Sequence, residues 1–211
     1  MTDLAAHLPL FAAAYAILLV AALSPGPAVA MLLGIGTARG RGPALVASAG
    51  IATGSVVINL LTLVGVGLLL QQAAWAMTGL RILGAAYLAW LAWGSLKKAL
   101  APPSVTIADV PARSSARYFA MGMALQVTNP KAIAFWLAIA AVGATQGGGA
   151  GVVAAFVLGA WLISFACHGF WALVLSAAPV RTLYARFRRW VEGTLGAFMG
   201  YMAIRLATER I

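Results

Sequence analysis

Long apolar runs alternate with short polar segments along the whole chain. Six of these runs are long enough for a helix to cross about 30 Å of hydrocarbon, at residues 8–36, 43–70, 73–96, 118–144, 151–178 and 191–208. Helices are expected because backbone groups in lipid must find their hydrogen-bond partners within the spanning segment. The sequence does not show the period-two alternation of a membrane β-strand. We therefore predict an all-α membrane protein with six transmembrane helices.

Basic residues are distributed unevenly over the five loops between these runs. The second and fourth loops carry none. The first loop carries Arg39 and Arg41, and the third carries Lys97, Lys98, Arg113 and Arg117. The fifth carries Arg181, Arg186, Arg188 and Arg189. Loops rich in Lys and Arg stay on the cytoplasmic side of a membrane. With six spans, both termini are then expected outside, and the N-terminal segment agrees, because it contains Asp3 and no basic residue before Arg39.

The composition supports a membrane location and excludes several other classes. Of the residues, 63% are hydrophobic and 9% are charged, whereas soluble domains carry about 25% charged residues. The net charge of +10 does not indicate nucleic-acid binding, because the basic residues lie in short loops between apolar runs. Ala28-Val29-Ala30 resembles a signal-peptide cleavage site, but the basic n-region is missing and the apolar stretch is too long. The single cysteine, Cys167, allows no intrachain disulfide.

The stretch 99–116 is the one long polar linker, and it divides the chain into two halves of three spans each. We predict repeats at 1–98 and 117–211 within one membrane domain, joined by this cytoplasmic linker. A half with an odd number of spans places the second half upside down relative to the first, which makes an inverted repeat, a frequent transporter plan. Corresponding motifs support this, since Pro25 and Pro130 are 105 residues apart and Gly84 and Gly196 are 112 apart.

Proline motifs interrupt the first span of each half. Ser24-Pro25-Gly26-Pro27 lies within the first span, and Asn129-Pro130-Lys131 lies within the fourth. Proline removes a backbone donor and clashes with the preceding turn, so we predict broken helices in spans one and four. The half-helices that follow present free N–H groups and a partial positive charge, which suit a carboxylate.

We therefore predict a substrate site at the two breaks. Ser24 and Asn129 offer hydrogen bonds to an amino or hydroxyl group. Lys131 is either a counter-ion for a carboxylate or a cation that caps backbone carbonyls or reaches the interface. The alternative for each break is a kink that only serves packing. Asn59, in span two, is a further candidate for substrate binding.

Few titratable groups are available for proton coupling. His168 in span five and Glu192 in span six are the candidates. Each has a structural alternative, because a core histidine can simply be hydrogen-bonded and Glu192 can pair with Arg188 or Arg189. Glycine pairs four residues apart, Gly50 with Gly54 and Gly196 with Gly200, predict close helix packing.

These motifs resemble those of the LysE/RhtB family of amino-acid exporters. The resemblance is carried by Ser24-Pro25-Gly26-Pro27, Gly50-Ile51-Ala52-Thr53-Gly54, Leu83-Gly84-Ala85-Ala86-Tyr87-Leu88 and Asn129-Pro130-Lys131-Ala132. It implies a multi-pass protein of the bacterial inner membrane that exports amino acids with the proton gradient and forms homo-oligomers, often dimers. Where many members carry Leu-Pro-Gln-Phe after the fourth-span motif, this chain has Ala140-Ala141-Val142-Gly143.

We predict a secondary active exporter of amino acids or close derivatives, with alternating access around the breaks. Neutral zwitterions are favoured because no acid clearly lies in the membrane to hold a cationic side chain. A heavy-metal or cation exporter is one alternative, although Cys167 and His168 are adjacent and so point in different directions on a helix. A membrane-embedded enzyme is another, although no catalytic constellation is visible. We expect no cofactor and no resident metal.

Overall fold

A computed structural model describes residues 2–72, 74–101 and 111–208, and within these ranges the protein is all helical. The helices are α1 Thr2–Leu23, α2 Pro27–Arg39, α3 Arg41–Gln72, α4 Ala74–Leu100, α5 Ser115–Thr128, α6 Pro130–Ala141, α7 Ala150–Leu175 and α8 Ala178–Thr208. Each predicted apolar run corresponds to one helix or to a pair of helices. Most of the predicted linker, residues 102–110, lies outside the described residues.

The first predicted run is broken as expected, between α1 and α2. Pro25 has no N–H, so the carbonyl of Ala21 loses the donor that a continuous helix would supply. The Ser24 hydroxyl replaces this donor and bonds the Ala21 carbonyl at 2.9 Å. Ser24 therefore ends α1 with the Ala21 carbonyl hydrogen-bonded. Pro27 occupies the first position of α2, where a missing N–H costs nothing.

The fourth predicted run is broken in the same way, between α5 and α6. Pro130 cannot donate to the carbonyl of Gln126, and the Asn129 backbone N–H bonds that carbonyl instead, at 3.2 Å. The Asn129 side chain then caps the new helix, because its Oδ1 accepts from the Lys131 backbone N–H at 3.1 Å. Both predicted helix breaks are confirmed.

The fifth loop differs from the prediction. Its arginines were expected between the last two spans, but α8 begins at Ala178 and the connection from α7 consists of Ser176 and Ala177. Arginine is a good helix former, so the helix extends beyond the apolar run that hydropathy detects. The arginine-rich segment is thus the first part of α8.

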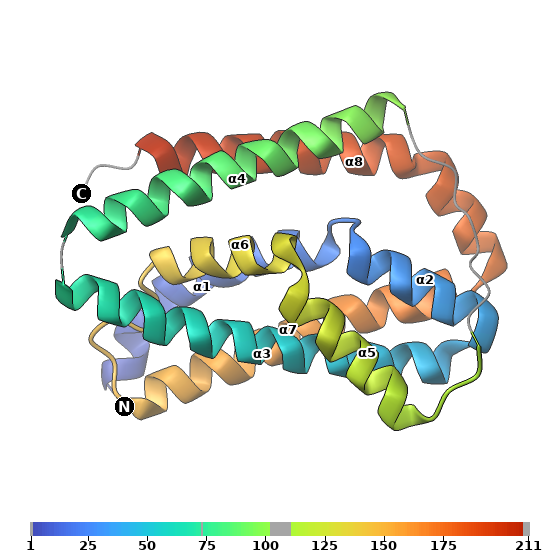
Figure 1. Ribbon diagram of the computed structural model, residues 1–211, viewed down its shortest axis with the longest axis horizontal. Helices are drawn as coiled ribbons and strands as arrows, with labels where there is room; N and C mark the ends of the chain where they lie inside the picture. Colours follow the sequence, from blue (N-terminus) through green and yellow to red (C-terminus); the bar gives the residue numbers. More distant parts are fainter. Residues whose placement is uncertain (1, 73, 102–110, 209–211) are drawn as a thin grey trace.

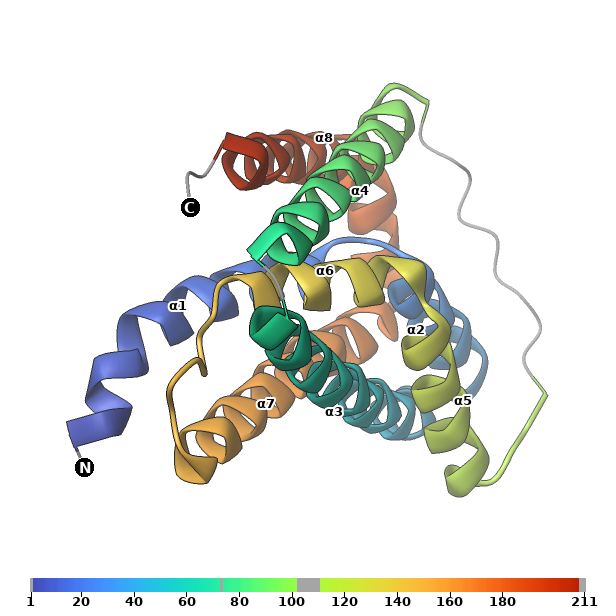
Figure 2. The same cartoon turned by 60° about the vertical axis from the view of Figure 1, so that its left-hand side comes forward.

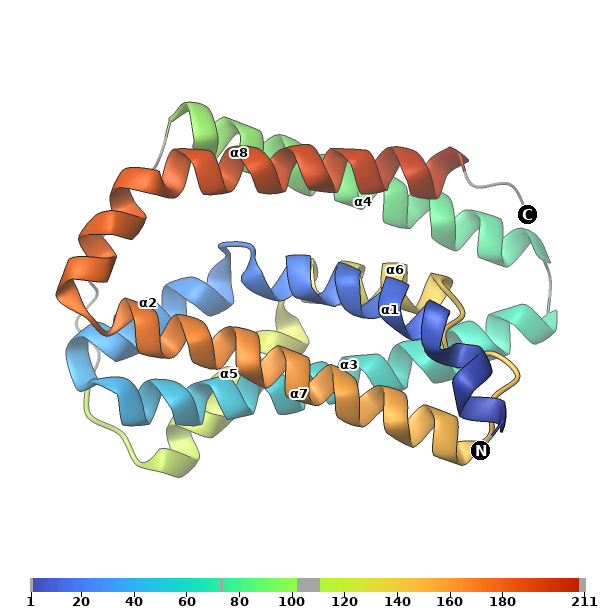
Figure 3. The ribbon, with the colours of Figure 1, turned by 180° about the vertical axis from the view of Figure 1, so that it is seen from behind.

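The helices are arranged in layers (Figure 1). α3 packs against α5 and α7, and α7 also packs against α1 and α2. α4 and α8 lie side by side in a separate layer that meets the remaining helices mainly through α6 (Figure 2). The sites where α1 gives way to α2 and α5 gives way to α6 lie at the middle of the molecule (Figure 3).

The two ends of the molecule differ in charge. Both termini lie at one end, together with the α3–α4 and α6–α7 connections (Figures 1 and 3). The opposite end contains the α2–α3 and α7–α8 connections, the end of α4 and the start of α5. Most basic residues belong to this second end, since Arg39 ends α2, Arg41 begins α3, and Lys97 and Lys98 lie in the last turn of α4, whereas Arg205 in the last turn of α8 belongs to the first end. The alternation of basic and neutral loops therefore corresponds to two faces of the structure.

Three helices among the described residues are long and apolar enough to cross a membrane without interruption. They cover Leu4–Leu23, Arg41–Gly65 and Ala150–Leu175. α2 and α6 are shorter apolar helices of 13 and 12 residues, as expected for parts of interrupted spans.

Glycines bring α3 and α5 into backbone contact. A Cβ added to Gly50 would lie 2.0 Å from the Phe119 carbonyl oxygen, and one added to Gly122 would lie 2.1 Å from the Ala47 carbonyl oxygen. Gly196 likewise lets α8 approach the Ala92 carbonyl of α4, at 3.1 Å from its added Cβ. Of the predicted glycines, close packing is confirmed at Gly50, Gly54 and Gly196, whereas an added Cβ at Gly200 would lie 3.9 Å from its nearest neighbour, an ordinary contact. The packing of Gly50 and Gly54 positions α3 beside the break that ends α5.

Gly50→Ala is expected to destabilise the folded protein by about 1–3 kcal/mol, because the added methyl group overpacks a backbone contact. Unfolding of the purified protein in detergent measures this. Gly65→Ala is the matched control on the same helix, since nothing lies within 4 Å of its added Cβ. Equal stability of the two variants would show that the α3–α5 contact is not as close as described.

Candidate functional site

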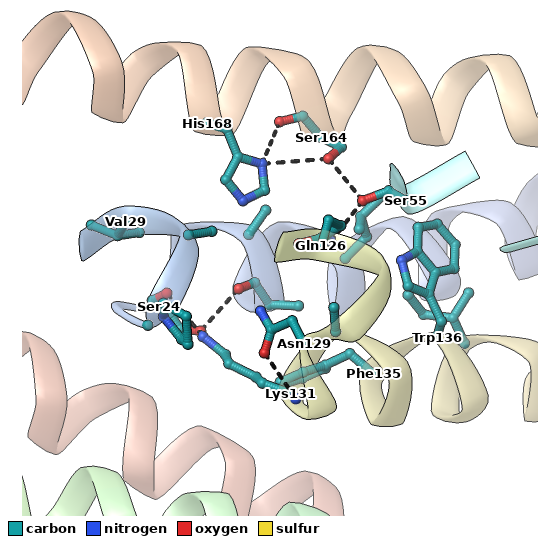
Figure 4. Close-up of a pocket in the computed structure, with 18 residues that line it drawn as sticks. Ser24, Val29, Ser55, Gln126, Asn129, Lys131, Phe135, Trp136, Ser164 and His168 are labelled. Carbon is teal, nitrogen blue, oxygen red and sulfur yellow. Dashed lines mark hydrogen bonds between the residues drawn. The ribbon is translucent and has the colours of Figure 1, made fainter. Parts of the chain in front are cut away.

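A small cavity of about 30 Å³ lies where the two helix breaks meet α3 and α7 (Figure 4). This volume holds about two water molecules. The polar side chains that line it are Ser24, Ser55, Gln126, Asn129, Lys131, Ser164 and His168. Lys131 is half-buried and the others are buried. Phe135, Trp136 and Ile139 of α6 supply an apolar wall. We call this space the central cavity.

The Lys131 ammonium joins the second break to the first. Its Nζ donates to the Ser24 carbonyl oxygen at 2.9 Å and to the Pro25 carbonyl oxygen at 3.5 Å, and it also contacts the Ser24 hydroxyl oxygen. Gly26 leaves room for this approach, because a Cβ there would lie 3.2 Å from Nζ. Of the roles expected for Lys131, the structure shows the capping of backbone carbonyls.

A chain of polar side chains crosses the central cavity from α5 to α7. Gln126 Nε2 donates to Ser55 Oγ at 2.8 Å, and Ser55 Oγ lies 3.3 Å from Ser164 Oγ. Ser164 in turn lies beside His168, whose Nδ1 is 2.8 Å from the Ser164 carbonyl oxygen and 3.4 Å from its hydroxyl. Three helices are therefore connected through hydrogen bonds in the interior.

The position of the proton on His168 follows from this contact. A carbonyl oxygen can only accept, so Nδ1 carries a proton and donates to Ser164. Nε2 is then the nitrogen that can take up or release a second proton. His168 lines the central cavity, so a proton bound there would lie at the wall of this cavity.

The structure brings most of the predicted site residues together. Ser24, Gly26, Pro27, Asn129, Lys131 and His168 line the central cavity. Pro25 and Pro130 line a neighbouring cavity on the α4 side of the breaks. These residues form one region, although they come from opposite halves of the chain.

Asn59 and Glu192 do not line the central cavity. Asn59 is buried on α3, one turn beyond Ser55, and its Nδ2 has no hydrogen-bond partner among the described residues. Glu192 is fully buried on α8, where Arg188 Nε lies 3.9 Å from its Oε1. The predicted pairing of Glu192 with an arginine is therefore present.

Sequence analysis missed Ser55, Gln126 and Ser164 as site residues. Two of them were detectable from spacing. Ser164 lies four residues before His168 on the same face of α7, and Gln126 lies in the last turn of α5, three residues before Asn129. The contact between Gln126 and Ser55 joins residues 71 positions apart, and no local pattern predicts it. Within the described ranges, no group of three His, Cys, Asp or Glu residues could hold a metal ion.

Ser55→Ala is expected to cost about 1–3 kcal/mol of stability, because it leaves the buried Gln126 amide without its acceptor. Combined with Gln126→Leu, the loss should be smaller than the sum of the two single losses, by about 1 kcal/mol. The free energies of unfolding of the wild type, the two single variants and the double variant are measured in detergent. Thr128→Ala is the control, since its hydroxyl is exposed and bonds only carbonyls of its own helix. Strict additivity would contradict the buried contact.

Known proteins resemble this chain over nearly its whole length. The profile of the LysE type translocator family matches residues 19–210. The threonine efflux protein of Escherichia coli (strain K12) is 28% identical over 196 residues, which cover 91% of this chain and 94% of that protein. The leucine efflux protein of Klebsiella pneumoniae is 31% identical over 192 residues, which cover 88% and 89%.

A further relative, the uncharacterized membrane protein YahN of Escherichia coli (strain K12), is 26% identical over 196 residues, covering 89% of this chain and 84% of that protein. No solved structure matches this chain significantly. The family profile includes both helix breaks and all the residues of the central cavity except Leu18. The resemblance inferred from the motifs is confirmed: this chain belongs to the LysE-type translocator family, and it is a multi-pass membrane transport protein, not an enzyme.

Proposed function

We propose that this translocator is a secondary active exporter of neutral amino acids or close derivatives, coupled to the proton gradient. Two relatives that it matches over most of their length are named for threonine and leucine efflux. Both are neutral amino acids, which agrees with the absence of an acidic side chain among the residues lining the central cavity.

The observation that carries this proposal is the convergence of three positive groups on the central cavity. The N-terminus of α2 begins at Pro27 and that of α6 begins at Pro130, and both starts lie at the cavity or at its edge. Helix N-termini bear a partial positive charge and unpaired N–H groups. The Lys131 ammonium adds a full charge. A carboxylate is the ligand that this arrangement favours, and the Ser24 and Pro25 carbonyls suit an ammonium.

The helix contacts support two inverted repeats, 1–98 and 117–211. If α1–α2 corresponds to α5–α6, then α3 corresponds to α7 and α4 to α8. α3 packs on α5 and α6, as α7 packs on α1 and α2, and the remaining equivalent pairs, α3–α7 and α4–α8, pack on each other. We propose six spans on this basis, with the basic end in the cytoplasm and both termini outside the inner membrane.

Alternating access follows from where the central cavity is closed. Towards the α4 side it is closed by the Lys131 contact with the first break. Towards the end that holds both termini it is closed by Phe135, which also lines a larger cavity of about 490 Å³ between α1, α4, α6 and α8. Lys131 and Phe135 lie one turn apart on α6. A small movement of α6 and its repeat would open one side while the other remains closed.

Asn129→Ala is expected to reduce efflux of threonine or leucine at least about tenfold, because it removes the cap that orients α6 and a polar group at the cavity. Pro25→Ala and Pro27→Ala should also reduce efflux, because each restores a backbone N–H and favours a continuous helix where α1 now gives way to α2. Cells that express the chain are loaded with threonine- or leucine-containing dipeptides, and released amino acids are quantified over time.

Thr128→Ala is the matched control, next to Asn129 but exposed. Each variant is first shown to be inserted in the membrane at the wild-type level. Wild-type efflux by the Asn129 and proline variants would contradict the helix-break site. Absence of efflux of any amino acid by the inserted wild-type chain would contradict the proposed function.

His168→Ala is expected to lower proton-driven efflux about tenfold while exchange at equal pH stays within about twofold, because only net transport needs the proton carrier. Glu192→Gln is the parallel variant for the other candidate. Proteoliposomes with and without an imposed pH gradient separate the two activities. If His168→Ala retains the full effect of the gradient and Glu192→Gln loses it, the coupling group is Glu192.

A further inference from the structure

A second, larger cavity lies between α4 and the two helix breaks, on the other side of Lys131. Its volume is about 370 Å³, within the range of small-molecule sites. α4 contributes aromatic and basic side chains, namely Tyr87, Trp90, Trp93, Lys97 and Lys98. We call this space the α4 cavity. It lies towards the basic end of the molecule, since Lys97 and Lys98 occupy the last turn of α4.

The α4 cavity and the central cavity share one wall. Gly26, Pro27, Asn129 and Lys131 line both of them. Within this wall, the Lys131 side chain reaches across to the Ser24 and Pro25 carbonyls. The contact between an ammonium and two carbonyls therefore lies between a larger compartment and a smaller one.

The chemistry of the α4 cavity selects for a carboxylate with an apolar side chain. Three ammonium groups line it, those of Lys97, Lys98 and Lys131, and no acidic residue does so. Lys97 Nζ lies 5.1 Å from the centre of the Trp93 ring, so the charge is placed against an aromatic surface. Trp90 and Trp93 are exposed on this face and offer apolar area for a substrate side chain.

We propose that the α4 cavity is the cytoplasmic vestibule of the exporter, and that a zwitterionic substrate bound there opens the wall by inserting between Lys131 and the carbonyls of Ser24 and Pro25. The substrate carboxylate accepts hydrogen bonds from the Lys131 ammonium, and the substrate ammonium donates hydrogen bonds to the freed carbonyls of Ser24 and Pro25. This inference rests on the proposed function as an amino-acid exporter.

The exchange of partners is energetically balanced. Lys131 loses neutral carbonyl acceptors and gains an ionised carboxylate, so a Coulomb attraction between opposite charges is added to the hydrogen bond. The carbonyls lose one ammonium and gain another, so no buried polar group is left without a partner. A molecule with only one of the two charges cannot complete the exchange. The gate thereby selects amino acids with both a free amino group and a free carboxylate.

The test places a single cysteine in the vestibule. Cys167→Ser removes the native thiol, and Gly94→Cys introduces one that lines the α4 cavity, where nothing lies within 4 Å of an added Cβ. Ser95→Cys, a nearly isosteric change at another residue that lines the α4 cavity, is the second position if the first variant does not transport. In inverted membrane vesicles, labelling by a membrane-impermeant anionic maleimide is measured with threonine, threoninamide or N-acetylthreonine present, alongside uptake of labelled threonine.

Threonine is expected to protect the cysteine, threoninamide is expected not to, and N-acetylthreonine is expected to protect without being transported. Lys97→Gln with Lys98→Gln should raise the threonine concentration for half-protection about tenfold, whereas the corresponding Lys→Arg pair should not. Lys131→Met should keep protection but lower uptake at least about tenfold. Lys131→Arg, which retains the charge, should recover part of the uptake.

The outcomes separate this inference from the proposed function. If the wild-type chain transports threonine but threonine protects neither cysteine from labelling, the α4 cavity is not the vestibule. If threoninamide or N-acetylthreonine is transported as well as threonine, or if Lys131→Met transports normally, the gate is wrong. If the wild-type chain transports no amino acid at all, the proposed function fails first.

Discussion

The missing N–H groups of Pro25 and Pro130 are the constraint on which the rest of the structure depends. A helix in lipid has no water to satisfy carbonyls that lose their donors, so each break must be repaired by protein groups. The Ser24 hydroxyl repairs the first break at Ala21, and the Asn129 backbone repairs the second at Gln126. Lys131 then bonds the carbonyls that remain in the first break. The groups that keep the chain broken are thus the same groups that line the central cavity.

Close packing elsewhere holds these groups in place. Glycines 50 and 122 bring α3 and α5 into backbone contact, and the Gln126–Ser55 hydrogen bond lies beside that contact. α4 and α8 form a separate layer that reaches the other helices mainly through α6. This difference leaves larger cavities next to α4 and α8 and a small one in the tightly packed centre. The movement of α6 that we propose would take place on the side where these larger cavities lie.

Much of the fold was predictable because its determinants are local. The apolar runs, the proline breaks and the glycine contacts follow from a few neighbouring residues, and they were confirmed except for close packing at Gly200. The start of α8 was missed, because hydropathy detects the part of a helix suited to lipid and not the arginine-rich turns before it. Asn59 was expected at the site, but it lies one turn beyond the residue of α3 that reaches the cavity, Ser55.

The sequence by itself determined that the chain is helical, membrane-embedded and interrupted at two places, since these properties depend on composition and on residues a few positions apart. Only the tertiary structure decided which residues lie opposite the two helix breaks. Lys131 meets Ser24 across 107 positions, and Ser55 meets Ser164 across 109. Such contacts depend on how the two halves pack and on which side of each helix turns inward. A one-dimensional pattern carries no information on that choice between partners so far apart.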